Sequence, residues 1–193
     1  MGIYLNPEND EYKRAINSEI YVDKTELIAV TNRKLNTEHQ NICVSRPRRF
    51  GKSMAADMLT AYYDRSVDTA DLFDTLKIAS TKDYKKHLNQ YDVLKINMQF
   101  FLSMTHSMDE MLDKFSKFLR YDLMDEYTQI RFRDEDNLVQ VMKDIYANTR
   151  RPFIILIDEW DCLFREYKQD KEAQKKYLDF LRAWLKDQEY IAL

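Results

Sequence analysis

Two short stretches of the sequence carry residue types that bind phosphate and a divalent cation. The first covers residues 45–53, SRPRRFGKS, and ends in Gly51-Lys52-Ser53. In the pattern G-x-x-x-x-G-K-[ST], backbone N–H groups cradle phosphates, the lysine reaches the β- and γ-phosphates, and the hydroxyl binds Mg²⁺. The sequence departs from this pattern because Arg46 stands where the first glycine is usual. An ordinary basic turn is the alternative interpretation of these residues.

Glycine usage favours the phosphate-loop interpretation. The chain has two glycines, Gly2 and Gly51, whereas about 7% of residues are glycine in an ordinary chain. The one internal glycine therefore falls where a backbone must approach a ligand closely or adopt a positive φ. The short apolar stretch 41–45 predicts a buried strand before the loop. Apolar residues at helical spacing predict a helix after it: Ala55, Met58, Leu59, Tyr62 and Tyr63.

The second stretch is FIILIDEWD, residues 153–161. Its apolar part predicts a central parallel strand that delivers Asp158 at its carboxyl end, where a carboxylate suits a Mg²⁺ contact. Glu159 follows directly and is placed to polarise a water for phosphoryl transfer. Adjacent acids after a strand also fit a loop start or a helix cap. For Asp161 we expect a cap or a hydrogen-bonded support role.

The densest basic cluster of the chain overlaps the first stretch. Arg46, Arg48 and Arg49 lie beside Lys52, and arginines bind phosphate groups bidentately or contact a nucleic-acid backbone. A solvated turn is the third alternative. The formal net charge is −3, with 30 basic and 33 acidic residues, so no whole-molecule field favours nucleic acid. We therefore expect phosphate contact first and nucleic-acid contact as an alternative.

Hydrophobic periodicity predicts the elements that position these residues. We expect strands over 91–98 and 152–158 and helices over 24–34, capped by Asp23-x-x-Glu26, and 171–189. Further helices are predicted over two short segments, 70–76 and 82–90, after a Ser107 cap, and from Leu138 to Tyr146. Strands that alternate with helices predict an α/β fold around a mostly parallel sheet, as one domain over residues 1–193.

Composition excludes several other classes of protein. No apolar run approaches the roughly 20 residues of a membrane span, and the N-terminus lacks a secretory signal, so we expect a cytoplasmic location and no membrane partner. Cys43 and Cys162 lie far apart without a C-x-x-C, and the histidines His39, His87 and His106 are scattered. This distribution argues against a disulfide scaffold and a zinc site.

Three motifs together resemble the bacterial AAA-ATPase-like family of P-loop proteins, which is often joined to a C-terminal nuclease-like domain of the PD-(D/E)XK type. They are YVDKTELI (21–28), SRPRRFGKS (45–53) and ILIDEWD (155–161), and the resemblance extends over essentially the whole chain. An arginine in place of the first glycine is typical of that family. The resemblance implies a three-layer α/β/α P-loop fold of the catalytic-glutamate division, with ATP and Mg²⁺ as ligands.

The resemblance also implies roles for individual residues. Lys52 would bind the β- and γ-phosphates and Glu159 would activate water, as the two catalytic residues. Ser53 and Asp158 would hold Mg²⁺, and residues 21–25 would lie beside the nucleotide, under its adenine. The remaining nucleotide-binding residues would be those of the loop: Arg46, Pro47, Arg48, Arg49, Phe50, Gly51 and Met54.

The expected order of the sheet raises a question about its last strand. In related ATPases the strand that carries the sensor residue lies between the P-loop strand and the acidic strand, and it should follow directly after Tyr190. The chain stops at Leu193, so we expect a sheet truncated before its sensor strand, with the arginine finger and nuclease-like domain absent. The leading hypothesis is ATP binding with ATP hydrolysis. The alternatives are a nucleotide-controlled switch or assembly module for an effector domain, and a nucleic-acid-binding module.

Overall fold

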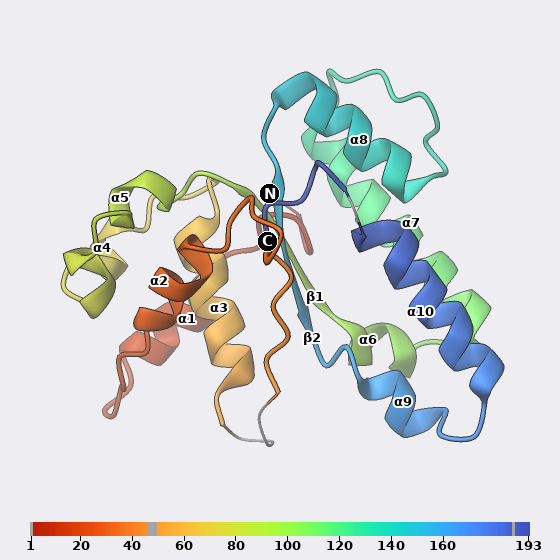
Figure 1. The fold of residues 1–193 in the computed structure, drawn as a ribbon, viewed down its shortest axis with the longest axis horizontal. Coiled ribbons are helices and arrows are strands. Elements are labelled where there is room, and N and C mark those ends of the chain that lie inside the picture. Colours follow the sequence, from red (N-terminus) through yellow and green to blue (C-terminus); the bar gives the residue numbers. More distant parts are fainter. Residues whose placement is uncertain (1, 46–49, 187) are drawn as a thin grey trace.

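Two parallel strands form the centre of the molecule. The computed structural model describes residues 2–45, 50–186 and 188–193. Strands β1 (Asp92–Asn97) and β2 (Phe153–Asp158) pair in register, with Asp92 opposite Phe153 and Asn97 opposite Asp158. Helices gather on both sides of this pair (Figure 1). Both strands were predicted from their apolar patterns, and their carboxyl ends emerge at one edge.

Two further segments lie along the outer edges of the strand pair. Leu5 bridges antiparallel to Leu94 of β1, and Ile191 bridges in parallel to Phe153 of β2. Phe153 donates its N–H to Tyr190 at 2.7 Å and accepts a hydrogen bond from Ala192 at 2.8 Å. The apolar residues 190–193 therefore take the place of a third parallel segment beside β2.

The first half of the chain covers one face of the strands. Its elements are α1 (Asp10–Ile16), α2 (Glu26–Asn32), α3 (Lys52–Tyr63), α4 (Ala70–Phe73), η1 (Lys77–Ser80) and α5 (Tyr84–His87). These elements share a core with Val93 of β1 and Ile154 of β2. Tyr62 and Tyr63 of α3 are fully buried in it, which confirms the helical apolar stripe predicted after Gly51.

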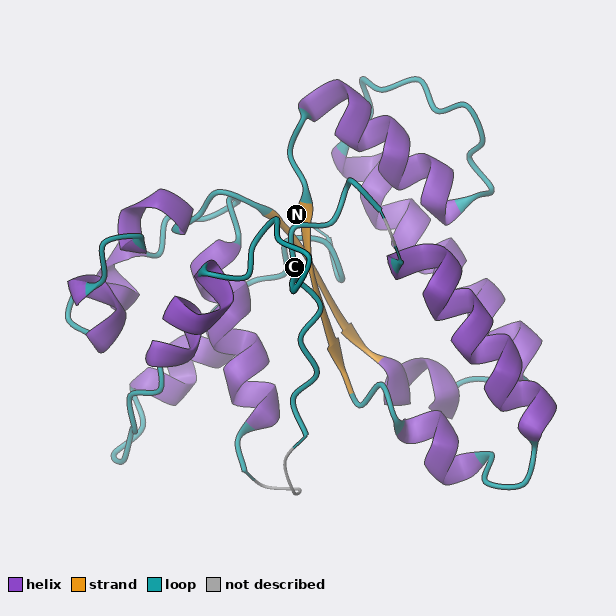
Figure 2. Cartoon of the chain, viewed as in Figure 1, coloured by secondary structure: helices purple, strands orange, loops and turns teal. Residues whose placement is uncertain are grey.

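The second half of the chain covers the opposite face: Figure 1 colours its helices from green to blue, and Figure 2 shows the same helices across the strands from the first group. Its helices are α6 (Met98–Ser103), α7 (Met108–Glu126), α8 (Leu138–Thr149), α9 (Cys162–Glu166) and α10 (Lys171–Leu185). They pack in a core with Leu94, Ile96 and Phe153. Because successive strand residues point to opposite faces, Val93 and Leu94 serve different cores. Because both faces of β2 are covered, its residues before Asp158 are all apolar.

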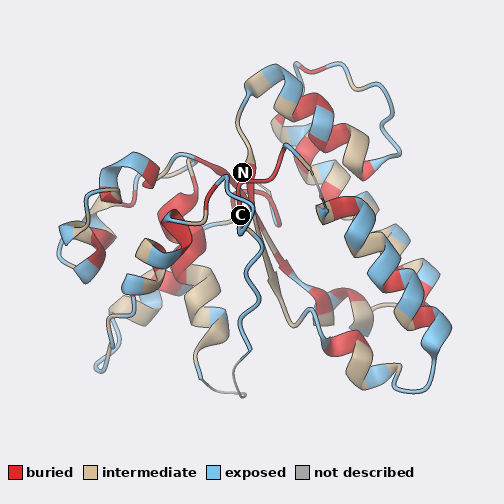
Figure 3. Cartoon of the chain, viewed as in Figure 1, coloured by how far each residue is buried: buried red, intermediate tan, exposed pale blue. Residues whose placement is uncertain are grey.

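The strands become less buried toward their carboxyl ends. The last residues of α3 and the first two of β2 are buried, whereas the first turn of α3 and residues 155–158 are only half-buried or exposed (Figure 3). The molecule is therefore a mixed α/β structure with a small parallel sheet. Within the described ranges, no helix is long and apolar enough to cross a bilayer.

The predicted strand over residues 41–45 is wrong. The segment has no regular secondary structure, and Ile42 and Val44 are 42% and 51% exposed. A short apolar segment becomes a strand only when a neighbouring strand satisfies its backbone groups. No backbone hydrogen bond between described residues involves this segment, and the outer edge of β2 is occupied at Phe153 and Ile155 by residues 190–193. The apolar composition alone did not reveal this.

Cap predictions succeeded at one helix and failed at another. The Ser107 hydroxyl accepts a hydrogen bond from the N–H of Glu110 at 3.2 Å, which confirms the cap of α7. Asp23 does not cap a helix over 24–34, because α2 begins only at Glu26 and its N-cap residue is Thr25. A local hydrogen bond competes: the Asp23 carboxylate accepts the N–H of Thr25 at 2.8 Å.

Candidate functional site

The two motifs found in the sequence meet at the carboxyl end of β2. Ser53, in the first turn of α3, donates a hydrogen bond from its hydroxyl to Oδ2 of Asp158 at 2.6 Å, across 105 positions of sequence. One turn further along α3, Asp57 forms an ion pair with Lys95 of β1. The pair ties α3 to the sheet, so the start of the helix is held against the ends of the strands.

Gly51 occupies the position where the chain turns into α3. Its φ is 78°, in the left-handed region, which L-residues with a Cβ rarely adopt. Its carbonyl accepts the N–H of Ala55 at 3.0 Å and so closes the first helical turn. Of the two reasons expected for this glycine, a close approach to a ligand or a positive φ, the second is observed. The N-terminal N–H groups and the positive end of the helix dipole face this turn, and such a helix start favours anions.

The structure places only part of the predicted phosphate loop. Lys52 is the first residue of α3 and is half-buried, Met54 follows on the same turn, and Phe50 is 61% exposed. Four predicted loop residues lie outside the described residues: Arg46, Pro47, Arg48 and Arg49. The described part of the site therefore runs from Phe50 into α3.

Glu159 follows β2 in a strained backbone conformation. Its φ is 52°, and its N–H donates to Oδ1 of Asp158 at 2.9 Å. The left-handed region costs a non-glycine residue on the order of 1 kcal/mol. The turn directs the Glu159 carboxylate to Arg165 of α9, with which it forms an ion pair. The structure thus separates the two adjacent acids: Asp158 contacts Ser53, and Glu159 contacts an arginine.

Arg165 is the residue of this site that the sequence patterns missed. Its guanidinium also binds Oδ1 of Asp161 at 2.7 Å, so it bridges two carboxylates. The hydrogen bond with Glu159 is the main cause that raises the pKa of Arg165 above its ordinary value. The available signal was the spacing of Asp161 and Arg165, which are four residues apart at a helix start. Asp161 has the hydrogen-bonded support role that was expected and makes no side-chain cap.

Ser53 and Asp158 fit a Mg²⁺ site by their chemistry. Both offer hard oxygen ligands, and the Ser53 hydroxyl directs its proton to Asp158, so the lone pairs of the hydroxyl stay available for a cation. Among the described residues, no three His, Cys, Asp or Glu side chains come together as a metal cluster. Mg²⁺ characteristically uses one or two protein ligands together with substrate phosphates, and the Ser53 and Asp158 pair matches that pattern.

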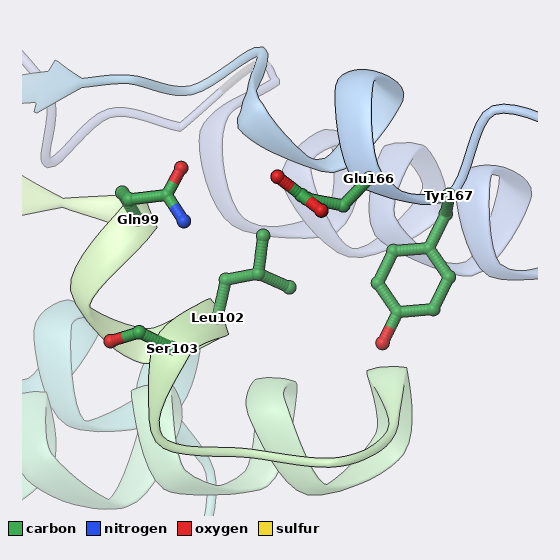
Figure 4. A pocket seen from close by; sticks show the side chains of 5 residues that line it. All are labelled: Gln99, Leu102, Ser103, Glu166 and Tyr167. Atoms are coloured by element: carbon green, nitrogen blue, oxygen red, sulfur yellow. The ribbon is translucent and has the colours of Figure 1, made fainter.

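A separate hollow of about 390 Å³ opens between α6 and α9. Figure 4 shows the side chains that line it: Gln99, Leu102, Ser103, Glu166 and Tyr167. Helix α6 directly follows β1 and α9 contains Arg165, so the hollow lies beyond the carboxyl ends of the strands. Its lining includes neither Ser53 nor Asp158, so it is distinct from their contact.

Comparison with known proteins identifies the family. A family model described as "Predicted AAA-ATPase" matches residues 10–190, which include both motifs. A search of curated proteins and a search of solved structures each found no match. The matched range covers nearly all of the chain and contains the residues that meet at the carboxyl end of β2. The chain therefore belongs to the predicted AAA-ATPase family.

Proposed function

We propose that this chain is a Mg²⁺-dependent ATP-binding domain that hydrolyses the bond between the β- and γ-phosphates with an activated water. The observation that carries the proposal is the 2.6 Å hydrogen bond between Ser53 and Asp158. It brings the start of α3, which carries Lys52 and Ser53, to Asp158 at the end of β2. P-loop ATPases combine a lysine, a hydroxyl and an acid in this way. Membership of the predicted AAA-ATPase family supports it.

Each residue has a role that follows from its position. Lys52, at the start of α3, contacts the β- and γ-phosphates, which lie against the N-terminal turn of the helix. Ser53 and Asp158 hold Mg²⁺. When bound, the ion neutralises charge that develops on the phosphate oxygens. Glu159 accepts a proton from the attacking water after its carboxylate leaves Arg165.

The same proposal extends to the architecture. Helices on both faces of β1 and β2, and residues 190–193 on the outer edge of β2, support a three-layer P-loop fold. Parallel strands with their ligand site at the carboxyl edge follow the general rule for open α/β sheets. The nucleic-acid alternative draws no support from the described residues, since its arginines lie outside them.

Lys52→Ala tests the binding step. We expect ATP affinity to fall about ten- to hundredfold, because a charge-assisted contact to phosphate contributes about 1.5–3 kcal/mol. Calorimetric titration measures the affinity, and circular dichroism checks that the fold is retained. Lys117→Ala, an exposed lysine of α7, is the matched control and should bind ATP like the parent. Unchanged affinity in Lys52→Ala would remove the site assignment.

A nucleotide-controlled switch is the second candidate function, and one contact favours it. The Glu159 carboxylate is engaged by Arg165, so the group needed for hydrolysis is held in an ion pair. In this function ATP occupancy, and not turnover, changes the contacts to an effector. A chain that binds ATP and holds Glu159 away from it is suited to that role.

Arg165→Ala tests whether the ion pair holds Glu159 back from hydrolysis. If the ion pair withholds Glu159, we expect the steady-state rate of phosphate release to rise about two- to fivefold with ATP affinity unchanged, since partly exposed ion pairs contribute up to about 1 kcal/mol. Arg182→Ala, in an exposed pair of α10, is the control. A rate that falls in Arg165→Ala would contradict the withholding role and show that Arg165 orients Glu159 productively.

A further inference from the structure

A lysine from outside the two motifs reaches the start of α3. The Nζ atom of Lys24 lies 3.4 Å from the point that a Cβ on Gly51 would occupy. Cε of Met54 lies 3.7 Å from the same point. The ammonium group therefore stands at the turn that leads into Lys52 and Ser53, although Lys24 belongs to the segment before α2.

The segment that carries Lys24 is held in place on both sides of it. The Asp23 carboxylate accepts hydrogen bonds from the Thr25 N–H at 2.8 Å, the Thr25 hydroxyl at 2.7 Å and the Lys77 N–H at 2.8 Å. The buried Thr25 hydroxyl accepts the N–H of Ile78 at 3.1 Å. These contacts anchor Asp23 and Thr25 to η1, so the exposed Lys24 between them is presented toward Gly51.

The charge of Lys24 is not neutralised by a described carboxylate. Lys77, whose backbone N–H binds Asp23, pairs with Glu26 at 3.4 Å, and Lys95 pairs with Asp57. No such ion pair with a described residue involves Lys24. A cation beside a helix N-terminus is electrostatically unfavourable, because that end of the helix carries partial positive charge. An anion bound between Lys24 and the start of α3 relieves this repulsion, because it is attracted to the ammonium group and to the helix N-terminus.

We propose that Lys24 is a second phosphate-binding lysine of this site, which contacts the polyphosphate of a nucleoside di- or triphosphate from the Gly51 side. The assignment rests on the proposed function and specifies it further. It differs from the expectation that residues 21–25 lie under the adenine, since the ammonium of Lys24 stands at the phosphate turn. The anchored backbone holds the lysine ready before the nucleotide arrives, which limits the entropy lost on binding.

The test compares ADP with inorganic tripolyphosphate in the full chain. We expect Lys24→Met to weaken ADP binding about tenfold, the loss of one charge-assisted contact to phosphate, and to weaken competition by tripolyphosphate by a similar factor. Lys24→Arg keeps the charge and should retain most of the affinity. Lys77→Met is the matched control, because the N–H of Lys77 that binds Asp23 belongs to the backbone and is kept in the variant, and it should bind ADP like the parent.

Three other outcomes would overturn the assignment of Lys24 to the phosphates. Unchanged ADP affinity in Lys24→Met rules it out, and if Lys52→Ala has lost binding at the same time, the proposed function stands without it. Weaker ADP binding with unchanged tripolyphosphate competition would place Lys24 at the base or ribose. A parent chain that binds neither ligand removes both the proposed function and this inference. Thermal unfolding without ligand should be the same for parent and Lys24→Met, so a folding defect is recognised separately.

Discussion

Glu159→Gln is expected to reduce ATP turnover at least about a hundredfold, the lower end of the contribution of a positioned general base. Glutamine has nearly the shape of glutamate but accepts no proton at neutral pH. ATP affinity should change little, because the proposed phosphate and Mg²⁺ ligands are Lys52, Ser53 and Asp158. The substitution also removes the ion pair with Arg165. Freeing residue 159 from Arg165 does not restore the rate, because glutamine cannot accept the proton.

Steady-state phosphate release measures the turnover, and calorimetric titration measures ATP affinity in the same preparation. Glu166→Gln is a matched control, because Glu166 is an exposed acid at the end of α9. It should hydrolyse ATP at the parent rate. A Glu159→Gln chain that turns over normally contradicts the assignment of the base. A parent that binds ATP and releases no phosphate supports the switch instead.

Asp92→Ala is expected to lower the free energy of unfolding by about 3–5 kcal/mol, the cost of removing one partner from a buried ion pair. Asp92 is fully buried at the start of β1. Its carboxylate accepts hydrogen bonds from Asn6 at 2.9 Å, Arg65 at 2.6 Å and Tyr127 at 2.5 Å, and Arg151 lies at 3.3 Å. Removing it leaves two guanidinium groups beside an unfilled space.

The Asp92 cluster joins parts of both halves of the chain. Burial, with the charge and hydrogen bond of Asp92, raises the pKa of Tyr127 to about 12. Burial by itself lowers the pKa of Arg65, but the charge of Asp92 and the hydrogen bonds with Asp92 and Tyr127 together outweigh burial, and the pKa is raised overall. These shifts mean that Tyr127 stays neutral and Arg65 stays charged throughout the neutral range.

Urea unfolding followed by circular dichroism measures the effect of Asp92→Ala. Glu11→Ala removes an exposed pair with Arg14 and should leave the midpoint unchanged. Asp92→Asn keeps the shape and loses the charge, so it should fall between the parent and Asp92→Ala. Because Asp92 lies at the opposite end of β1 from Asn97, the folded fraction should still bind ATP. An unfolding curve of Asp92→Ala that overlies the parent's would contradict the role of the cluster.

Most helices and strands were predicted correctly because the spacing of apolar residues within a segment depends on how that segment is buried. The amphipathic stripes of α3, α7, α8 and α10 and the apolar runs of β1 and β2 each report how one segment is buried, and all six were predicted near their observed bounds. The failed strand at 41–45 has the same kind of pattern. What it lacks in the structure is a hydrogen-bonded neighbour, and a neighbour in a parallel sheet comes from elsewhere in the chain.

The sequence by itself determined the chemistry of the site: Gly51 where a positive φ is needed, a lysine and a hydroxyl at a helix start, and two acids after a buried strand. Only the tertiary structure decided how these groups divide. It brings Ser53 to Asp158, turns Glu159 to Arg165 and presents Lys24 at Gly51. The physical reason is distance along the chain. Residue type and spacing act over a few neighbours, whereas these contacts depend on how α3, α9 and the segment before α2 pack around one pair of strands.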